Sequence, residues 1–221
     1  MTDRFKGKVV LVTGAGKGTG RAVAEAFAAE DAILALNDIS PMNVQILNDW
    51  INAHRGHSKV YIHDIAKKVA AQALINQVVD SFDRIDILVN CANVQPYGPL
   101  LNMDEWDLHR AFEVNAIGTF IMLQSVARVM REQGGGIIIN VTKFTTDSAH
   151  AAYSASRLAA AGLVIQAADE LAPHNIQIHA AVTGLPQLHN CRTTCTSLAE
   201  AVLTLCGEDF VGQTGKIINV A

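Results

Sequence analysis

The chain has little of what marks a secreted, membrane-spanning or nucleic-acid-binding protein. It begins with a polar stretch unlike a signal peptide, and no apolar run reaches the roughly 20 residues that a membrane-spanning helix needs. Lys and Arg number 17 against 21 Asp and Glu, so the formal net charge of −4 offers no attraction to a nucleic acid or an anionic membrane. We expect a cytoplasmic protein that contacts neither.

Cysteine is scarce and lacks the spacing of a metal site. Four cysteines occur, and neither a Cys-x-x-Cys nor a His-x-x-x-His pair is present. The set that comes nearest to a zinc site is His189 with Cys191, Cys195 and Cys206. We interpret these cysteines and Cys91 as ordinary reduced thiols and predict no metal. The eight histidines are scattered, and we interpret them as structural or surface residues.

Hydrophobic residues make up half of the chain and fall in short runs separated by helical segments. The expected strands cover residues 9–13, 32–38, 59–64, 85–90, 137–141, 176–181 and 215–220, and the two longest expected helices cover 104–132 and 153–171. Strands that alternate with helices in this way predict one α/β domain over residues 1–221. Its sheet is doubly wound and mostly parallel, with helices on both faces.

The stretch from Val9 to Gly20 carries the first functional signal. An apolar run ends at Thr13, four glycines then alternate with small residues, and a helical segment follows. This order points several backbone N–H groups and the positive end of a helix at one place, and the missing Cβ atoms let a pyrophosphate come close. We predict a dinucleotide site whose phosphate cradle is formed by Gly14, Gly16, Lys17, Gly18, Thr19 and Gly20.

Asp38 ends the next expected strand, about 20 residues after the glycines, where a carboxylate can accept hydrogen bonds from the adenosine ribose. A carboxylate at this position repels a 2′-phosphate, which favours NAD over NADP. Lys17 and Arg21 act in the opposite direction, because either cation could neutralise such a phosphate.

These motifs make the chain resemble the short-chain dehydrogenases/reductases of the classical type. Thr13 to Gly20 matches the family's Thr-Gly-x-x-x-Gly-x-Gly motif, and the later motif positions hold Asn115, Tyr153 with Arg157, and the Thr183-Gly184 turn. The segments His63-Asp64-Ile65 and Asn90-Cys91-Ala92-Asn93 resemble its adenine-contacting segment and its Asn-Asn-Ala-Gly strand end. The resemblance spans almost the whole chain. It implies a seven-stranded Rossmann fold, a nicotinamide cofactor bound also by Asp64, Ile65, Asn90 and Ala92, and a homodimer or homotetramer.

The resemblance also implies hydride transfer between the cofactor and a small alcohol or carbonyl compound. Tyr153 would be the acid/base and Asn115 would support the proton relay. Arg157 stands where the family has a lysine that binds the ribose and lowers the tyrosine pKa, so Tyr153 and Arg157 also belong to the cofactor site. A guanidinium can still bind ribose hydroxyls, but it does not release its proton and cannot pass one along.

The substrate half departs further from the family pattern. Lys143 occupies the position of the catalytic serine and could itself donate to the substrate oxygen. Thr142 has a hydroxyl but is one residue away, which turns it to the other face of a strand, and Ser148 in the following loop is a third candidate. The segment between Gly184 and residue 214 is short where the family has a substrate-covering lid, so we expect weakened substrate binding and catalysis.

Two functions remain open at this point. The first is an NAD(H)-dependent oxidoreductase acting on a small alcohol or carbonyl compound. The second is a catalytically degenerate relative that binds a dinucleotide without turnover, as a sensor or as a partner subunit. A purely structural protein without a nucleotide is disfavoured, because the glycine turn and Asp38 are both present.

Overall fold

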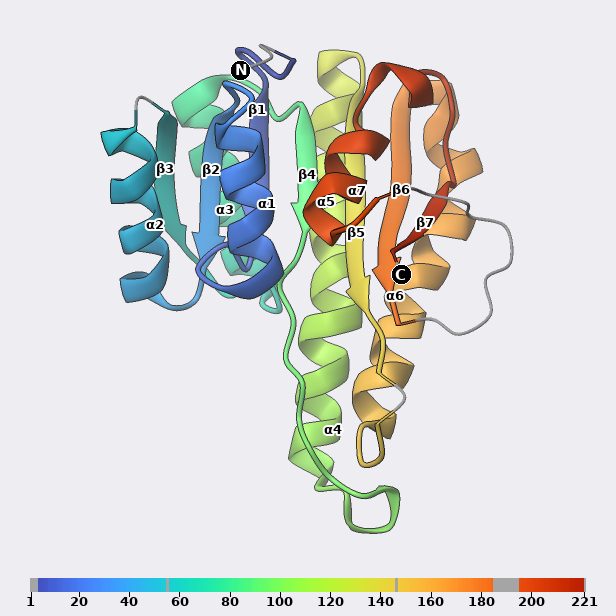
Figure 1. Cartoon of the computed structure of the whole chain (residues 1–221). Coiled ribbons are helices and arrows are strands. Elements are labelled where there is room, and N and C mark those ends of the chain that lie inside the picture. Colours follow the sequence, from blue (N-terminus) through green and yellow to red (C-terminus); the bar gives the residue numbers. More distant parts are fainter. Residues whose placement is uncertain (1–3, 55, 146, 185–194, 221) are drawn as a thin grey trace.

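The seven strands of the described residues belong to one parallel sheet, in the order β3-β2-β1-β4-β5-β6-β7 (Figure 1). The computed structural model describes residues 4–54, 56–145, 147–184 and 195–220. The strands are β1 (Val9–Thr13), β2 (Ile33–Asp38), β3 (His57–Ile62), β4 (Ile87–Asn90), β5 (Gly136–Lys143), β6 (Ile176–Thr183) and β7 (Ile217–Val220). The order reverses beside β1, so the predicted doubly wound Rossmann fold is confirmed and ligands are expected at the carboxyl ends of β1 and β4.

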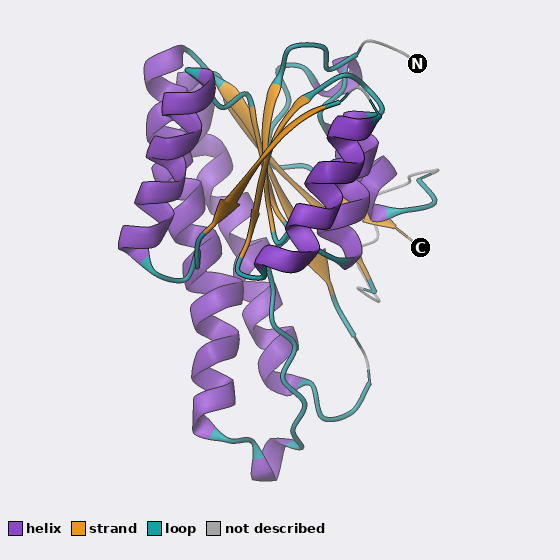
Figure 2. Cartoon of the chain, turned by 90° about the vertical axis from the view of Figure 1, so that its left-hand side faces the viewer, coloured by secondary structure: helices purple, strands orange, loops and turns teal. Residues whose placement is uncertain are grey.

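Helices cover both faces of the sheet (Figure 2). One face carries α1 (Gly18–Ala28), α2 (Pro41–Ala53) and α7 (Leu198–Leu205), and the other carries α3 (Lys68–Phe82), α5 (Thr119–Gln133) and α6 (Ala151–Leu171). Helix α4 (Glu105–Phe112) and the first turns of α6 project beyond the carboxyl edge of the sheet (Figure 1). No helix in the described part of the chain is long and apolar enough to cross a membrane.

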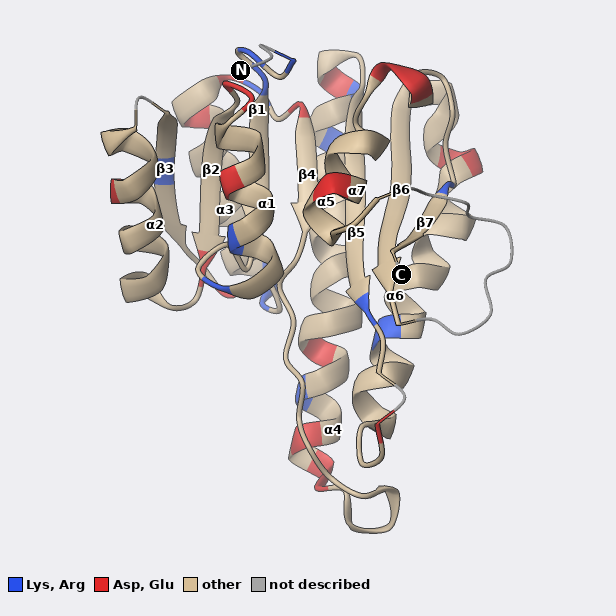
Figure 3. Cartoon of the chain, viewed as in Figure 1, with Lys and Arg blue, Asp and Glu red and all other residues tan. Residues whose placement is uncertain are grey.

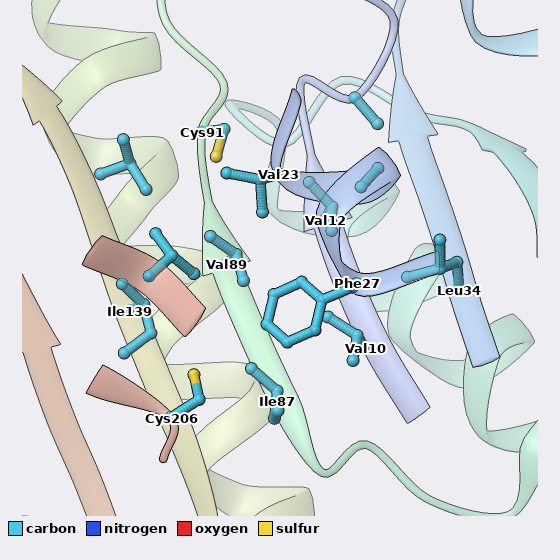
Figure 4. Close-up of a cluster of buried hydrophobic side chains, with 14 of the residues drawn as sticks. Val10, Val12, Val23, Phe27, Leu34, Ile87, Val89, Cys91, Ile139 and Cys206 are labelled. Carbon is cyan, nitrogen blue, oxygen red and sulfur yellow. The ribbon is translucent and has the colours of Figure 1, made fainter. Parts of the chain in front are cut away.

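The sheet has a hydrophobic core on each face because its side chains alternate. Val10 and Val12 point into the core beneath α1, where the fully buried Phe27 is surrounded by strand side chains (Figure 4). Val9 and Leu11, the alternate residues of the same strand, point into the core beneath α3 and α5. Each fully buried side chain of this size stabilises the fold by about 1.5–3 kcal/mol, so the strand ends rest on a rigid support.

The expected helix over residues 104–132 is not continuous. A six-residue π-helix, Glu113–Gly118, joins α4 to α5 and contains Asn115. A π-helical turn inserts one residue into the helical repeat and changes the direction of the side chains that follow, and such turns concentrate at functional sites. The periodicity of apolar residues does not reveal it, because the pattern is shifted at only one point.

Candidate active site

A cleft of about 730 Å³ lies at the carboxyl ends of the central strands. Its wall is made of residues from the carboxyl ends of β2 and β5, from the loops that follow β1, β2, β3 and β4, and from α1, α2, α4, the π-helix and α6. These residues are Gly14, Lys17, Gly18, Thr19, Gly20, Asn37, Asp38, Ile39, Ser40, Asn43, His63, Asp64, Ile65, Cys91, Ala92, Asn93, Val94, Gln95, Arg110, Val114, Lys143 and Tyr153. Most of the predicted cofactor residues are thus brought together. Gly16, Asn90, Asn115 and Arg157 are not among the residues of the wall.

The glycines between β1 and α1 have different structural roles. A Cβ on Gly14 would lie 2.6 Å from the Cα of Ala92, and one on Gly20 would collide with the carbonyl oxygen of Gly14. These two glycines let the loop pack against β4 and let α1 approach β1. Gly18 has a φ of +54° and nothing within 4 Å of its ideal Cβ position. The space above Gly18 is therefore open toward the cleft, as a phosphate cradle requires.

Asp38 lines the cleft with its carboxylate held in place by two backbone donors. Its Oδ2 accepts from the N–H of Gly16 at 2.8 Å, and its Oδ1 accepts from the N–H of Ser40 at 2.9 Å. Gly16 thus acts through Asp38, and a Cβ on Gly16 would meet this carboxylate at 2.9 Å. Each carboxylate oxygen keeps a free lone pair, so a ribose hydroxyl can still be bound.

The two cations that could neutralise a 2′-phosphate differ in their surroundings. The guanidinium of Arg21 is paired with Glu25 at 2.8 Å, one helical turn further along α1. Lys17 is exposed in the cleft wall. Arg21 is thus already compensated, which leaves Lys17 as the cation that could offset the charge of Asp38 next to the expected ribose position.

Asp64 is fixed by a loop contact and by an ion pair that the sequence does not reveal. Its Oδ1 accepts from the N–H of Ala66 at 3.0 Å, and its Oδ2 is 3.2 Å from the guanidinium of Arg110 in α4. Arg110 also pairs with Glu113 at 2.9 Å. The charge of Asp64 is therefore compensated, and Ile65 beside it is buried in the same wall.

Asn90 lies in the floor beneath the cleft. It is buried, and its side-chain amide donates to Oδ1 of Asn140 on β5 at 3.0 Å. The ends of β1 and β4 are joined by the hydroxyl of Thr13, which accepts from the N–H groups of Cys91 and Ala92 at 3.2 Å each. These contacts hold the strand ends together and bring Ala92 into the wall.

Asn115 is fully buried, and its polar atoms are all engaged within the protein. Its side-chain amide accepts from the N–H of Val94 and donates to the carbonyl of Val94, both at 2.8 Å, and it also donates to the hydroxyl of Ser156. Its carbonyl accepts from the hydroxyl of Thr119 at 2.9 Å. In this structure Asn115 therefore holds the segment after β4 against α6.

Tyr153 lines the cleft but is only 1% exposed. Its hydroxyl donates to the backbone carbonyl of Lys143 at 2.8 Å. The ring of His150 lies edge-on between Tyr153 and Tyr97, with centroid distances of 6.3 and 5.6 Å. Burial raises the pKa of Tyr153, and the positive charge of Arg157 acts in the opposite direction.

Arg157 is buried below the end of β5 and is not paired with any carboxylate of the described residues. Its Nη2 donates to the carbonyl of Val141 and is 3.4 Å from the hydroxyl of Thr142, while its Nε has no hydrogen-bond partner in the described chain. Burial lowers the pKa of Arg157, and the nearby Tyr153 and Cys91 raise it. The guanidinium is thus directed at the sheet and not into the cleft.

Of the three candidates for the missing serine, only one reaches the cleft. Thr142 is fully buried beside Arg157, on the side of β5 that strand alternation predicts. Ser148 is exposed and is not among the residues of the cleft wall. Lys143 lines the cleft, at the residue whose carbonyl binds Tyr153.

The two buried thiols of the described residues, Cys91 and Cys206, show no sign of activation, because burial raises the pKa of both. Burial raises the pKa of Cys91 to about 12, although Arg157 acts to lower it. Cys195 and Cys206 are free thiols, and within the described ranges no group of His, Cys, Asp and Glu side chains is arranged to hold a metal ion. His189 and Cys191, the other members of the set considered for zinc, lie outside the described residues.

Several wall residues are absent from the sequence prediction. Ile39 and Ser40 directly follow β2, and Val94 lies in the loop after β4, so the rule that ligands bind beyond the carboxyl ends of parallel strands could have found them. Arg110 carries no such signal, because it reaches the wall from α4. His150, which precedes α6, is not a wall residue but contacts the ring of Tyr153, and only the packing of these segments shows either position.

Comparison with known proteins gives one consistent answer. A sequence model described as short chain dehydrogenase matches residues 8–197. An uncharacterized oxidoreductase of Thermotoga maritima is 34% identical over 186 residues, which cover 83% of this chain and 73% of that protein. The D-threitol dehydrogenase of Mycolicibacterium smegmatis is 38% identical over 165 residues, covering 72% of this chain and 63% of that protein.

Similarity to a 7alpha-hydroxysteroid dehydrogenase extends over the full chain. The protein from Escherichia coli K12 is 31% identical over 242 positions, covering 99% of this chain and 94% of that protein. This alignment is longer than the 221 residues present here, so part of that relative has no counterpart. A solved structure of a 7alpha-hydroxysteroid dehydrogenase with NADH and 7-oxo glycochenodeoxycholic acid has a TM-score of 0.88 at 28% identity, covering 99% of this chain and 94% of that one.

Proposed function

We propose that this chain transfers hydride between NAD(H) and a small alcohol or carbonyl compound. The chain belongs to the short-chain dehydrogenase family of oxidoreductases. One observation carries the proposal. The glycine loop with its open position at Gly18, the carboxylate of Asp38 and the ring of Tyr153 all line the same cleft. A nucleotide and a proton-transferring group can therefore meet in one site.

The family binds nicotinamide cofactors, and the cleft fits such a group. Its volume of about 730 Å³ lies within the range of small-molecule sites. Gly14 to Gly20 would hold the pyrophosphate, Asp38 the adenosine ribose, and Asp64 with Ile65 the adenine. When bound, the nicotinamide supplies or accepts the hydride. The negative charge of Asp38, with Arg21 already paired to Glu25, supports NAD over NADP.

Tyr153 is proposed as the acid/base. In the reducing direction its hydroxyl would give its proton to the substrate oxygen as that oxygen becomes negative, and Lys143 would donate a hydrogen bond to the same oxygen. The Tyr153 proton is held by the Lys143 carbonyl in this structure, so the hydroxyl must turn from that carbonyl to the substrate. Arg157 would favour the tyrosinate from behind the strand, and Asn115 would position the segment after β4.

Two measurements test this function. NADH and NADPH are titrated into the purified protein, and a panel of neutral alcohols and carbonyl compounds is assayed with wild type and Tyr153→Phe. We expect saturable NADH binding, weaker NADPH binding, and a loss of about 10²–10⁴-fold in kcat for Tyr153→Phe that far exceeds its effect on NADH affinity. Tyr61→Phe is the matched control, because Tyr61 is also buried and its hydroxyl has no hydrogen-bond partner in the described chain.

The alternative of a sensor or partner subunit makes a different prediction for the same experiments. Saturable NADH binding without turnover of any compound would contradict the enzyme hypothesis and support the sensor hypothesis. Absence of NADH binding at millimolar concentration would contradict both hypotheses. Turnover that survives Tyr153→Phe would show that Tyr153 is not the acid/base.

We also propose that the chain forms a homodimer or homotetramer. Four large apolar side chains are exposed on α5, α6 and the π-helix before α5, namely Ile117, Phe120, Leu158 and Ile165. Light scattering on the purified protein tests this, and a monomer at micromolar concentration would contradict it. The cytoplasmic location and the single domain over residues 1–221 stay predictions from the sequence.

A further inference from the structure

The charges in the cleft are distributed unevenly along its length. The acidic residues of its wall are Asp38 and Asp64. Asp38 is bound by the N–H groups of Gly16 and Ser40, and Asp64 is bound by Ala66 and paired with Arg110. Asp38 ends β2 and Asp64 follows β3, whereas Lys143 ends β5 on the other side of β1 and β4, so these contacts hold both carboxylates away from Lys143.

Lys143 is the charged residue of the cleft wall at the end that holds Tyr153. Its backbone is fixed on both sides, because its carbonyl accepts from the hydroxyl of Tyr153 at 2.8 Å and the next N–H, that of Phe144, donates to Thr183 at 2.8 Å. Its side chain is exposed, and none of the described residues forms a hydrogen bond or an ion pair with its ammonium group. The strand end is thus rigid, and the ammonium group on it is available.

A second cation lies behind the first. Arg157 is 3% exposed, is bound to the carbonyl of Val141, and has an Nε without a hydrogen-bond partner in the described chain. Figure 3 shows the basic end of β5 next to a basic position on α6. Buried charges are normally paired, and two cations without a carboxylate make this end of the cleft electropositive.

We propose that the substrate carries a carboxylate next to the reacting carbon, so that it is a 2-hydroxy acid in one direction and a 2-oxo acid in the other. The inference rests on the proposed function and names its substrate class. An ammonium group has three donors and a full positive charge, so Lys143 can bind one carboxylate oxygen and the C2 oxygen together. A serine at this position would offer one neutral donor and would favour no charged neighbour.

The proposed reduction balances without a further reactant. The C2 carbon receives the hydride from the nicotinamide cofactor, the π bond to its oxygen breaks, and that oxygen takes the proton of the Tyr153 hydroxyl. The carboxylate is unchanged, and Lys143 donates hydrogen bonds without giving up a proton. The tyrosinate that remains faces the positive charge of Arg157, which stabilises it.

The first test compares charged and neutral substrates of equal shape. Pyruvate, 2-oxobutyrate and phenylglyoxylate are each assayed with NADH against the corresponding primary amide. We expect kcat/KM to be at least about tenfold higher for the acids at low salt, in line with a charge-assisted contact, and the advantage to shrink as salt is added. Equal or higher kcat/KM for the amides would overturn the inference while leaving the proposed function intact.

Variants at Lys143 separate the charge from the hydrogen bond. Lys143→Gln is expected to bring acids and amides within about threefold of each other, and Lys143→Glu to reverse the preference. Lys143→Ser places the hydroxyl of the family at this position and is expected to lose the preference for acids, measured as the ratio of kcat/KM between each acid and its amide. Lys68→Gln, an exposed lysine of α3 outside the cleft, is the control and should behave as wild type. A preference for acids that survives Lys143→Gln contradicts the inference.

A binding measurement decides the inference even if no compound is turned over. Oxamate is an analogue of pyruvate in which an amino group replaces the methyl group, and it keeps the carboxylate. It is titrated by calorimetry into wild type and Lys143→Gln in the presence of NADH. We expect wild type to bind it at least about tenfold more tightly than the variant. Equal affinities, or no binding to either protein, would overturn the proposed substrate class. If the wild-type protein binds oxamate more tightly than Lys143→Gln but turns over none of the compounds, the result would count against the proposed function alone.

Discussion

The cofactor half and the substrate half of the cleft are built on different principles. In the cofactor half the shape comes from the backbone, through glycines that allow close approach and an Asp38 carboxylate held by two N–H groups. In the substrate half the shape depends on a few side chains, and Tyr153 and Arg157 both donate to carbonyls of β5. Backbone geometry tolerates few substitutions, whereas single side chains can be exchanged without loss of the fold.

The largest effect is expected from a matched pair of glycine substitutions in the cofactor half. Gly20→Ala forces α1 away from β1 and should lower the free energy of unfolding by about 3 kcal/mol, as overpacking does. Gly18→Ala meets no atom within 4 Å and carries only the cost of its positive φ, about 1 kcal/mol, but should weaken NADH binding at least about tenfold. Chemical denaturation and NADH titration check both. Equal destabilisation by the two variants would show that the glycines do not have separate tasks.

Mild acid should lower the free energy of unfolding through His179, which lies on β6 in the substrate half of the sheet. Burial, with a smaller contribution from Lys216, lowers the pKa of this β6 histidine to about 4. The unfolded chain binds the proton more tightly, so the stability is complete above pH 6.5 and is lost as the pH falls toward 4, by about 3 kcal/mol in total.

Unfolding measurements between pH 7.5 and 4 check this expectation. His179→Asn should flatten the dependence on pH, while His57→Asn, an exposed histidine of β3 in the cofactor half, should leave it as in wild type. If the free energy of unfolding of His179→Asn depends on pH as strongly as that of wild type, other groups cause the loss of stability in acid.

Arg157→Lys should bring the substrate half closer to the family pattern. A lysine keeps the positive charge near Tyr153 and can pass a proton, so we expect kcat at neutral pH to rise about tenfold, a modest share of the contribution usual for acid–base catalysis. Arg157→Met removes the charge and should lower kcat instead. The dependence of kcat on pH is the measurement, and a kcat that rises equally in both variants would point to relief of a buried charge and not to proton transfer.

The smallest effect is expected for the choice of cofactor. Asp38→Asn keeps the size of the side chain and removes its repulsion of a 2′-phosphate, so the ratio of NADPH to NADH affinity should rise about fivefold at low salt. Glu25→Gln frees Arg21 and should add to this in the double variant. Competition titrations of the two cofactors check the ratio. If Asp38→Asn leaves it unchanged, Asp38 does not select the cofactor.

The sequence predicts the cofactor half of the cleft more accurately than the substrate half. Short-range patterns identify the strands, the glycine turn and the position of Asp38, because a buried parallel strand and a tight turn each restrict the residues that can form them. The motif position of Tyr153 is likewise visible in the sequence. These local rules act over a few residues and leave their mark in consecutive positions.

Only the tertiary structure decides where the remaining polar groups point. It directs Arg157 to the carbonyl of Val141, uses Asn115 to hold Val94, and brings Arg110 from α4 to Asp64. It also selects Lys143 over Thr142 as the donor that reaches the cleft. The physical reason is that each of these contacts joins segments far apart in the chain, and its outcome depends on burial and on which acceptors remain free once the sheet and helices have packed.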